Sequence, residues 1–156
     1  MTAEGPVWKP DGRQSETASG IQRGLARLLR AHDYVLLTEF PLASGRRADV
    51  IGLSPAGQIW IIEIKSSPAD YFADNKWHEY MEFCDRFSFA IPPEMDQALI
   101  PEAVGLIVAD PYGAEILRPP SEHVLHASRR KAVTQSFARA AALRLQALWE
   151  ASHIVL

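Results

Sequence analysis

The sequence has one cysteine, no long apolar run and no excess of basic residues, and each shortage excludes a class of protein. With Cys84 alone, no disulfide can form within the 156-residue chain, and a reducing cytoplasm is the expected setting. No apolar run approaches the ~20 residues that a membrane span needs, and the first residues lack the basic and apolar regions of a secretory signal. Sixteen Lys and Arg against nineteen Asp and Glu give a net charge of −3, which excludes indiscriminate binding of polyanions but not a local basic site.

Motifs for several common chemistries are missing as well. The five histidines show no zinc-ligand spacing, and the single cysteine leaves no cysteine cluster. There is no phosphate-cradling glycine loop and no G-x-S-x-G turn. Cys84, among apolar neighbours, is most simply a buried small hydrophobe.

Helical and strand patterns follow one another along the chain. Residues 1–14 are polar and rich in Pro and Gly, which predicts a flexible arm before one domain over 15–156. Helices are expected from the N-cap Ser15, over 70–85 and over 129–150. Strands are expected over 34–40, 47–53, 58–65, 87–91 and 104–109, with another at 114–117. The order predicts an α/β fold with a mixed central sheet flanked by helices.

The turn between the second and third expected strands fixes a register. Pro55 suits the first position of a type I turn, and Gly57 supplies the positive φ that follows it in a three-residue hairpin loop. Ser54 then faces Gln58, so that paired residue numbers sum to 112. Asp49 therefore faces Glu63, Arg47 faces Lys65, and all four side chains are expected on one face.

These four charges predict a binding site. Two carboxylates at cross-strand distance repel each other and resist joint ionisation, especially because Glu63 lies in an otherwise apolar strand. A divalent cation suits the two carboxylates and an anion suits the two basic residues, so a metal-bridged phosphodiester is the natural occupant. The alternative is a purely structural set of salt bridges at the end of a sheet.

Together, these residues resemble a known signature. Asp49 followed by Glu63-Ile64-Lys65 resembles the PD-(D/E)xK phosphodiesterase motif, and the α-β-β-β-α-β order is that of its restriction-endonuclease-like core. Longer strings are similar to the MmcB-related DNA-repair family. They are Gly45-Arg46-Arg47-Ala48-Asp49-Val50, Glu63-Ile64-Lys65-Ser66-Ser67, Asp70-Tyr71-Phe72, Asp74-Asn75-Lys76-Trp77-His78-Glu79-Tyr80 and Cys84-Asp85-Arg86-Phe87-Ser88-Phe89-Ala90. Ala48 departs from the proline of the motif's name, a change that removes no ligand.

The resemblance implies a role for each residue of the motif. Asp49 and Glu63 would be catalytic metal ligands for Mg²⁺ or Mn²⁺, with the backbone carbonyl of Ile64 as a third. Lys65 would orient or deprotonate the attacking water and offset charge on the phosphate. The superfamily often adds a further acidic ligand, for which Glu39 and Glu16 are the candidates, with Glu39 preferred; its structural alternative is a salt bridge to Arg46 or Arg47.

Contacts to DNA are expected from Arg47 and from the segment after Lys65. Lys76 and Tyr80 are four residues apart, hence on one face of the expected helix, and could reach a phosphate; Tyr80 could equally be half-buried core. Trp77 is either core or a base-stacking platform, with core favoured. Asp70 and Asp74 could bind metal or could cap and charge the helix start, with the cap favoured. The basic residues of the last helix could track a phosphate backbone or form a solvated face. They are Arg129, Arg130, Lys131, Arg139 and Arg144.

The sequence and the resemblance thus predict a Mg²⁺- or Mn²⁺-dependent nuclease that hydrolyses DNA in repair, cytoplasmic and associated with the nucleoid. DNA is the expected partner, no membrane is involved, and repair proteins or a second copy of the chain are further candidate partners. The alternatives are a DNA-binding module without turnover and an interaction module of a repair complex with a vestigial site.

Overall fold

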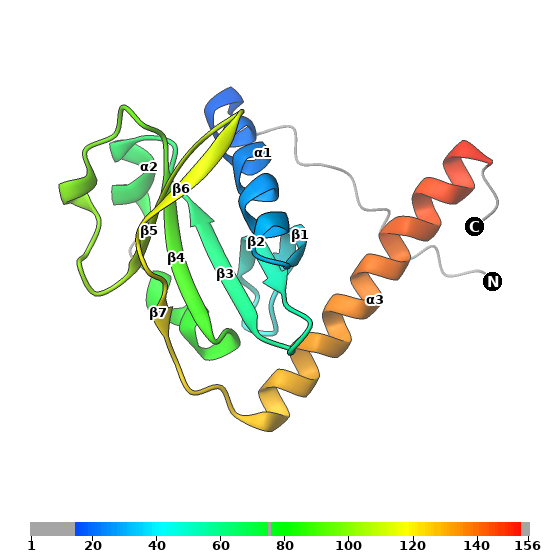
Figure 1. Ribbon diagram of the computed structural model, residues 1–156. Coiled ribbons are helices and arrows are strands. Elements are labelled where there is room, and N and C mark those ends of the chain that lie inside the picture. The colour runs from blue at the N-terminus through cyan, green and yellow to red at the C-terminus, as the bar shows by residue number, and fades with distance from the viewer. Residues whose placement is uncertain (1–14, 75, 154–156) are drawn as a thin grey trace.

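The computed structural model of the protein describes residues 15–74 and 76–153, and the expected arm at 1–14 lies outside this part (Figure 1). Three α-helices and two short 3₁₀ helices accompany the sheet. The helices are α1 (Glu16–Ala31), α2 (Pro68–Ala73), η1 (Trp77–Phe83), η2 (Gln97–Leu99) and α3 (Ala127–Ser152). The strands are β1 (Val35–Pro41), β2 (Arg47–Leu53), β3 (Ile59–Ile64), β4 (Arg86–Ile91), β5 (Gly105–Asp110), β6 (Gly113–Arg118) and β7 (Ser121–Glu122).

The sheet is mixed, as predicted. Its strands run in the order β1-β2-β3-β4-β5-β6, and β7 pairs with β4 outside this path. The pairs β1–β2 and β2–β3 are antiparallel hairpins, whereas β3–β4 and β4–β5 are parallel. The α-β-β-β-α-β order and the α/β class expected from the sequence are therefore confirmed, with helices on a mixed sheet.

Two apolar clusters pack on the two faces of the sheet. The apolar stripe of α1, including Ile21, Leu25 and Leu29, is buried against one face together with Trp60 and Ile62 of β3. The other face packs against η1 and the first half of α3; its largest side chains come from β1, β3, β4 and α3. They include Phe40, Ile61, Phe87, Phe89 and Phe137. Figure 1 shows the second half of α3 projecting away from the sheet.

The hairpin register is the predicted one. Val50 pairs with Ile62 and Leu53 with Ile59, so the paired numbers sum to 112. The Ser54 N–H donates to the Gln58 carbonyl over 3.0 Å, and the Gly57 N–H donates to the Ser54 carbonyl over 2.9 Å. Gly57 has φ +84°, the left-handed conformation that closes a three-residue loop.

Gly57→Val should lower the free energy of unfolding by about 1–2 kcal/mol, because a β-branched residue is strained at positive φ. A Cβ at Gly57 would meet nothing within 4 Å, so backbone strain is the only cost. Gly113→Val is the matched control, because that glycine also has open space but no positive φ. Equal denaturation midpoints for wild type and Gly57→Val would contradict this account of the turn.

The helix expected over 70–85 is wrong as one continuous element. Helix α2 ends at Ala73, and Asp74 has extended φ and ψ of −138° and 112° before η1 begins at Trp77. The Asp74 carboxylate accepts a hydrogen bond from the Lys76 N–H over 3.0 Å and pairs with Arg46. Such local side-chain bonds compete with the helical ladder, and here they break it. The sequence patterns do not predict η2 or β7.

Basic residues of α3 hold that helix to the sheet instead of forming only a solvated face. Arg130 makes a two-pronged ion pair with Asp85 and donates to the Gly57 carbonyl over 2.8 Å. Arg144 donates to the carbonyls of Thr38 and Glu39 in β1 over 2.7 and 3.2 Å. Two of the five cations considered for a phosphate track are therefore committed to the protein itself.

Candidate active site

A hollow of about 470 Å³ lies beside the start of β2 and the end of β3. All four charged residues of the predicted quartet line it, and α1, β1, α2 and η1 contribute the remaining walls. The lining residues are Ser15, Ala18, Gln22, Glu39, Arg47, Asp49, Glu63, Ile64, Lys65, Ser66, Asp70, Ala73, Asp74 and Tyr80. The sequence prediction that these four charges gather at one place is thus matched by the geometry.

Asp49 and Glu63 face each other at the point where β2 and β3 separate. The backbone pairing stops at Val50 and Ile62, and side chains replace it beyond that point. The Asp49 N–H donates to Glu63 Oε1 over 3.0 Å, and the Ile64 N–H donates to Asp49 Oδ2 over 2.8 Å. Each carboxylate is therefore oriented by the backbone of the opposite strand. Only one oxygen of each carboxylate takes part in these two hydrogen bonds.

The two carboxyl groups resist ionisation together. Burial raises the pKa of Glu63 well above its usual range, and the charge of the adjacent Asp49 raises it further. Burial also raises the pKa of Asp49, although the Ile64 N–H and Lys65 favour its ionised form. A compensating positive charge placed between them would let both ionise, because an opposite charge at close range lowers a carboxyl pKa.

Lys65 and Arg47 supply positive charge to the hollow from different depths. Lys65 is only 6% exposed, and its positive charge favours ionisation of the Asp49 and Glu63 carboxyl groups. Arg47 is half exposed at the rim, and its guanidinium lies 4.0 Å from Glu39. Lys65 therefore lies deep in the hollow beside the carboxylate pair, and Arg47 lies at its solvent-facing rim.

Of the two candidates for a further acidic residue, Glu39 lies in this hollow. It has φ +49° inside β1, a left-handed conformation that is strained for a residue with a side chain, and its carbonyl accepts from Arg144. Pairs in β1 and β2 sum to 88, so Glu39 lies opposite Asp49, although the backbone pairing skips this position. Three acidic residues thus follow one another across β1, β2 and β3.

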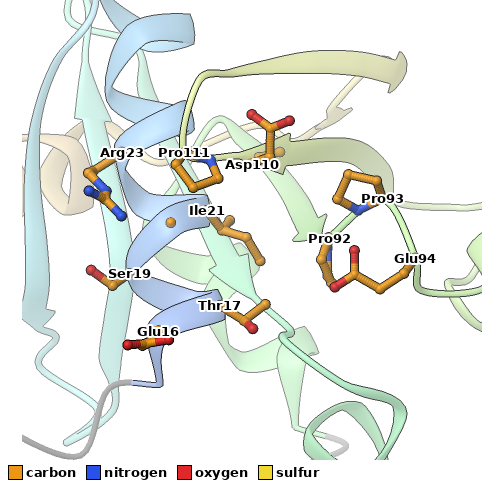
Figure 2. Close-up of a pocket in the computed structure, with 12 residues that line it drawn as sticks. Glu16, Thr17, Ser19, Ile21, Arg23, Pro92, Pro93, Glu94, Asp110 and Pro111 are labelled. Carbon is orange, nitrogen blue, oxygen red and sulfur yellow. The ribbon is translucent and has the colours of Figure 1, made fainter.

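Glu16 lines a different hollow, of about 670 Å³, between α1 and the segments that follow β4 and β5 (Figure 2). Figure 2 shows Glu16 near the start of α1, with Pro92, Pro93 and Glu94 across the hollow. This larger hollow does not include Asp49, Glu63 or Lys65. Glu39 is accordingly the candidate that shares the site of the carboxylate pair.

The donor set fits a hard divalent cation. Five carboxylates line the hollow against the two cations Arg47 and Lys65; they belong to Glu39, Asp49, Glu63, Asp70 and Asp74. Within residues 15–74 and 76–153, no three acidic, histidine or cysteine side chains already converge on one point. Mg²⁺ commonly takes only one or two carboxylates with further oxygens, which matches Asp49, Glu63 and the Ile64 carbonyl.

Tyr80 and Lys76 do not share a helical face. The Tyr80 side chain is buried, its hydroxyl donates to the Arg47 carbonyl over 3.2 Å, and it lines the hollow. Burial and the neighbouring carboxylates raise its pKa, so that the hydroxyl stays protonated. Lys76 is exposed just before η1 and does not line the hollow, because the break at Asp74 turns it away from the expected register.

Trp77 packs against the core, the alternative that the sequence favoured. Its ring lies 6.1 Å from that of Phe87 and stacks on His78 at 3.6 Å. Asp70 caps the start of α2 as expected: its carboxylate accepts from the Ser66 N–H over 3.0 Å, and its own N–H donates to the N-cap Ser67 over 3.1 Å. Asp74 ends α2 instead of charging its start.

Sequence reasoning missed two features of the site. The alternation of β2 is interrupted at Asp49, since Ala48 and Ile51 pack in one core cluster while Val50 packs in the other. It also missed the wall formed by Ser15, Ala18 and Gln22 of α1. The positive φ of Glu39 marks the matching irregularity in β1, and a glutamate gives no sequence signal for it.

The match to a family of known description points to DNA repair. Residues 6–152 match the family described as DNA repair protein MmcB-like. A solved structure from Silicibacter pomeroyi, titled a protein of unknown function, is 46% identical with a TM-score of 0.85, over 92% of this chain and 98% of that one. A repair endonuclease from Pyrococcus abyssi aligns at 15% identity with a TM-score of 0.33, over 58% of this chain and 43% of that one. A search of curated proteins found no match.

None of the helices in the described part of the chain is long and apolar enough to cross a membrane. The family match covers the whole sheet, both long helices and every residue of the hollow. The chain therefore belongs to the MmcB-like family of DNA repair proteins.

Proposed function

We propose that the protein is a metal-dependent nuclease that hydrolyses DNA phosphodiester bonds. The observation that carries this proposal is the pair of the partly buried Asp49 and the buried Glu63 beside Lys65 in an open hollow. Membership of a DNA repair family supports DNA as the substrate. Phosphodiester hydrolysis needs charge stabilisation and an oriented water, and this set of side chains can provide both.

Each residue has a proposed part in the reaction. Asp49, Glu63 and the Ile64 carbonyl would hold Mg²⁺ or Mn²⁺, which when bound supplies Lewis-acid stabilisation of charge on the phosphate. Lys65 orients the attacking water and stabilises the negative charge that develops on the phosphate oxygens. Arg47 at the rim contacts a neighbouring phosphate. Glu39 is the proposed additional acidic ligand or water contact.

A DNA-binding module without turnover is the second candidate. One oxygen of each central carboxylate already accepts a backbone N–H, which is a structural use of the same groups. In that case the hollow would bind DNA or a partner of a repair complex, and removing Asp49 would change stability without any loss of cleavage. Metal-dependent cleavage separates the two candidates.

Mn²⁺ should raise the melting temperature of the wild-type protein, because a ligand that binds only the folded state stabilises it. At a hundredfold excess over the dissociation constant the gain is about 2.7 kcal/mol, on the order of 5–10 °C for a domain of this size. Asp49→Ala should abolish the shift, because it removes one of two carboxylate ligands. Differential scanning fluorimetry with and without Mn²⁺ measures it.

Glu16→Ala is the control for that measurement, since Glu16 lines the other hollow and should leave the Mn²⁺ shift intact. A shift of equal size in Asp49→Ala and wild type would show that the metal binds elsewhere. Loss of the shift in Glu16→Ala but not in Asp49→Ala would reverse the assignment of the site.

A further inference from the structure

Helix α1 carries a row of three exposed arginines on the side that does not pack against the sheet. Arg23, Arg27 and Arg30, here called the arginine ridge, are spaced by four and three residues and so lie along one helical face. The ridge spans about 10 Å of helix at 1.5 Å per residue. Figure 2 shows the Arg23 side chain on α1, on the same side of the helix as Ser19 and Glu16.

The ridge has no carboxylate partner among residues 15–74 and 76–153, in contrast to Arg46, Arg47, Arg86 and Arg130. Arg46, Arg86 and Arg130 form ion pairs, and Arg118 and Arg144 donate to backbone carbonyls. The other exposed cations without a carboxylate partner are scattered. They are Lys76 before η1, and Lys131 and Arg139 two turns apart on α3.

The ridge lies on the helix that also forms a wall of the candidate active site, but on a different face of that helix. Gln22 lines the candidate active site, whereas Arg23, about 100° further around the helix, lines the larger hollow that contains Glu16. The active-site hollow itself holds five carboxylates against two cations, so it repels a polyanion except where a bound cation compensates. Affinity for a DNA backbone therefore needs a basic surface outside the hollow, and the ridge is a grouped set of cations without a carboxylate partner on another face of α1, the helix that forms one wall of the hollow.

We propose that the arginine ridge binds the phosphate backbone of the DNA whose scissile bond enters the hollow. This deepens the proposed function by assigning its DNA-positioning surface. Glu16 in the first turn of α1 carries the opposite charge, which limits the phosphate track to the two turns from Arg23 to Arg30. Such contacts are independent of base sequence, so the ridge gives affinity and orientation without specificity.

Arg23→Gln/Arg27→Gln should weaken the salt dependence of DNA binding, because each neutralised phosphate contributes about 0.9 to the slope of log K against log salt on duplex DNA and about 0.7 on single strands. The expected loss is thus about 1.8 on duplex and about 1.4 on single-stranded oligonucleotides. Fluorescence anisotropy in a metal-free buffer with chelator measures it on the full chain without hydrolysis. Glutamine keeps helix propensity, so the melting temperature should not change.

Lys131→Gln/Arg139→Gln is the matched control, since it removes two exposed charges from α3 and should keep the wild-type slope. An unchanged slope in the ridge variant, an equal loss in the control, or no salt-dependent DNA binding by wild type would each overturn the ridge proposal. Loss of binding to anionic lipid vesicles, with DNA binding intact, would assign the ridge to a membrane and overturn it as well.

The test also separates the ridge from the nuclease proposal. A protein that binds DNA through the ridge but never cleaves it in Mg²⁺ or Mn²⁺ would support the ridge and contradict the nuclease. A protein that cleaves DNA with an unchanged slope in the ridge variant would support the nuclease and contradict the ridge.

Discussion

Lys65→Ala should lower the single-turnover rate of DNA cleavage by roughly 10²–10³, the usual effect of losing one electrostatic catalyst. Lys65 is a buried cation in the hollow, and its charge acts on both Asp49 and Glu63. The rate should fall at saturating DNA, because the lost interaction is made with the charge that develops in the transition state. Rapid-quench cleavage of a labelled oligonucleotide in Mn²⁺ measures this rate.

Metal and DNA binding should survive the loss of Lys65. Asp49, Glu63 and the Ile64 carbonyl remain, so the Mn²⁺ shift in melting temperature should persist or increase slightly as a cation leaves the site. DNA affinity should fall modestly, and the slope of log K against log salt should fall by about one, the effect of losing one phosphate contact. Lys131→Ala, on the exposed face of α3, is the control and should keep the wild-type rate. A folded Lys65→Ala protein with the full cleavage rate would remove Lys65 from the chemistry.

Glu63→Gln should raise the stability of the metal-free protein at neutral pH, because burial and the charge of Asp49 raise the pKa of Glu63 well above its usual range and so disfavour its ionised form in the folded protein. Glutamine has the shape of glutamate and can still accept the Asp49 N–H. It removes one ionisable carboxyl group from the two carboxyls and one lysine that line the hollow, leaving the Asp49–Lys65 pair neutral overall. Urea denaturation in chelator measures the difference.

The pH dependence of that difference has a definite sign. The pKa of Glu63 is raised in the folded protein, so folding favours the protonated carboxyl and its contribution to stability is fully present at low pH. As the pH rises above the ordinary glutamate value of about 4.3, the unfolded chain ionises first and stability is lost until the raised folded pKa is passed. The advantage of Glu63→Gln over wild type should therefore grow with pH over this window and then level off.

Mn²⁺ should reverse the order of the two proteins, because the ionised wild type binds the metal and Glu63→Gln has lost a ligand. Glu102→Gln is the control, since it removes the same charge from an exposed position. A Glu63→Gln protein less stable than wild type at every pH without metal would mean that Glu63 serves mainly in a salt bridge with Lys65.

Local chemistry made much of the fold predictable. Pro55 and Gly57 determine the turn, and the turn sets the register that brings Asp49 opposite Glu63. The apolar stripe of α1 and the apolar run of β3 likewise predict which of their side chains are buried. These elements depend on residues close in sequence, which is why periodicity and turn chemistry suffice for them.

The parts that could not be predicted depend on contacts between distant residues. The break after Ala73 is stabilised by the ion pair of Asp74 with Arg46, which lies in the loop between β1 and β2. The left-handed Glu39 is held by Arg144, more than a hundred residues along the chain. The commitment of Arg130 to Asp85 likewise becomes visible only when α3 is placed. Sequence patterns do not reveal such pairings. They therefore predict Lys76 on the same helical face as Tyr80, and they do not decide between a phosphate track and a solvated face for the basic residues of α3.

The most direct test of the account is the cleavage of DNA by the wild-type protein and by Asp49→Asn, side by side in Mg²⁺ and in Mn²⁺. Single-stranded, duplex, flapped and branched substrates should all be offered. The account predicts cleavage of at least one substrate by wild type, its loss on chelation, and its loss in Asp49→Asn with the fold intact. No metal-dependent cleavage of any substrate by wild type, or equal cleavage by Asp49→Asn, would contradict it.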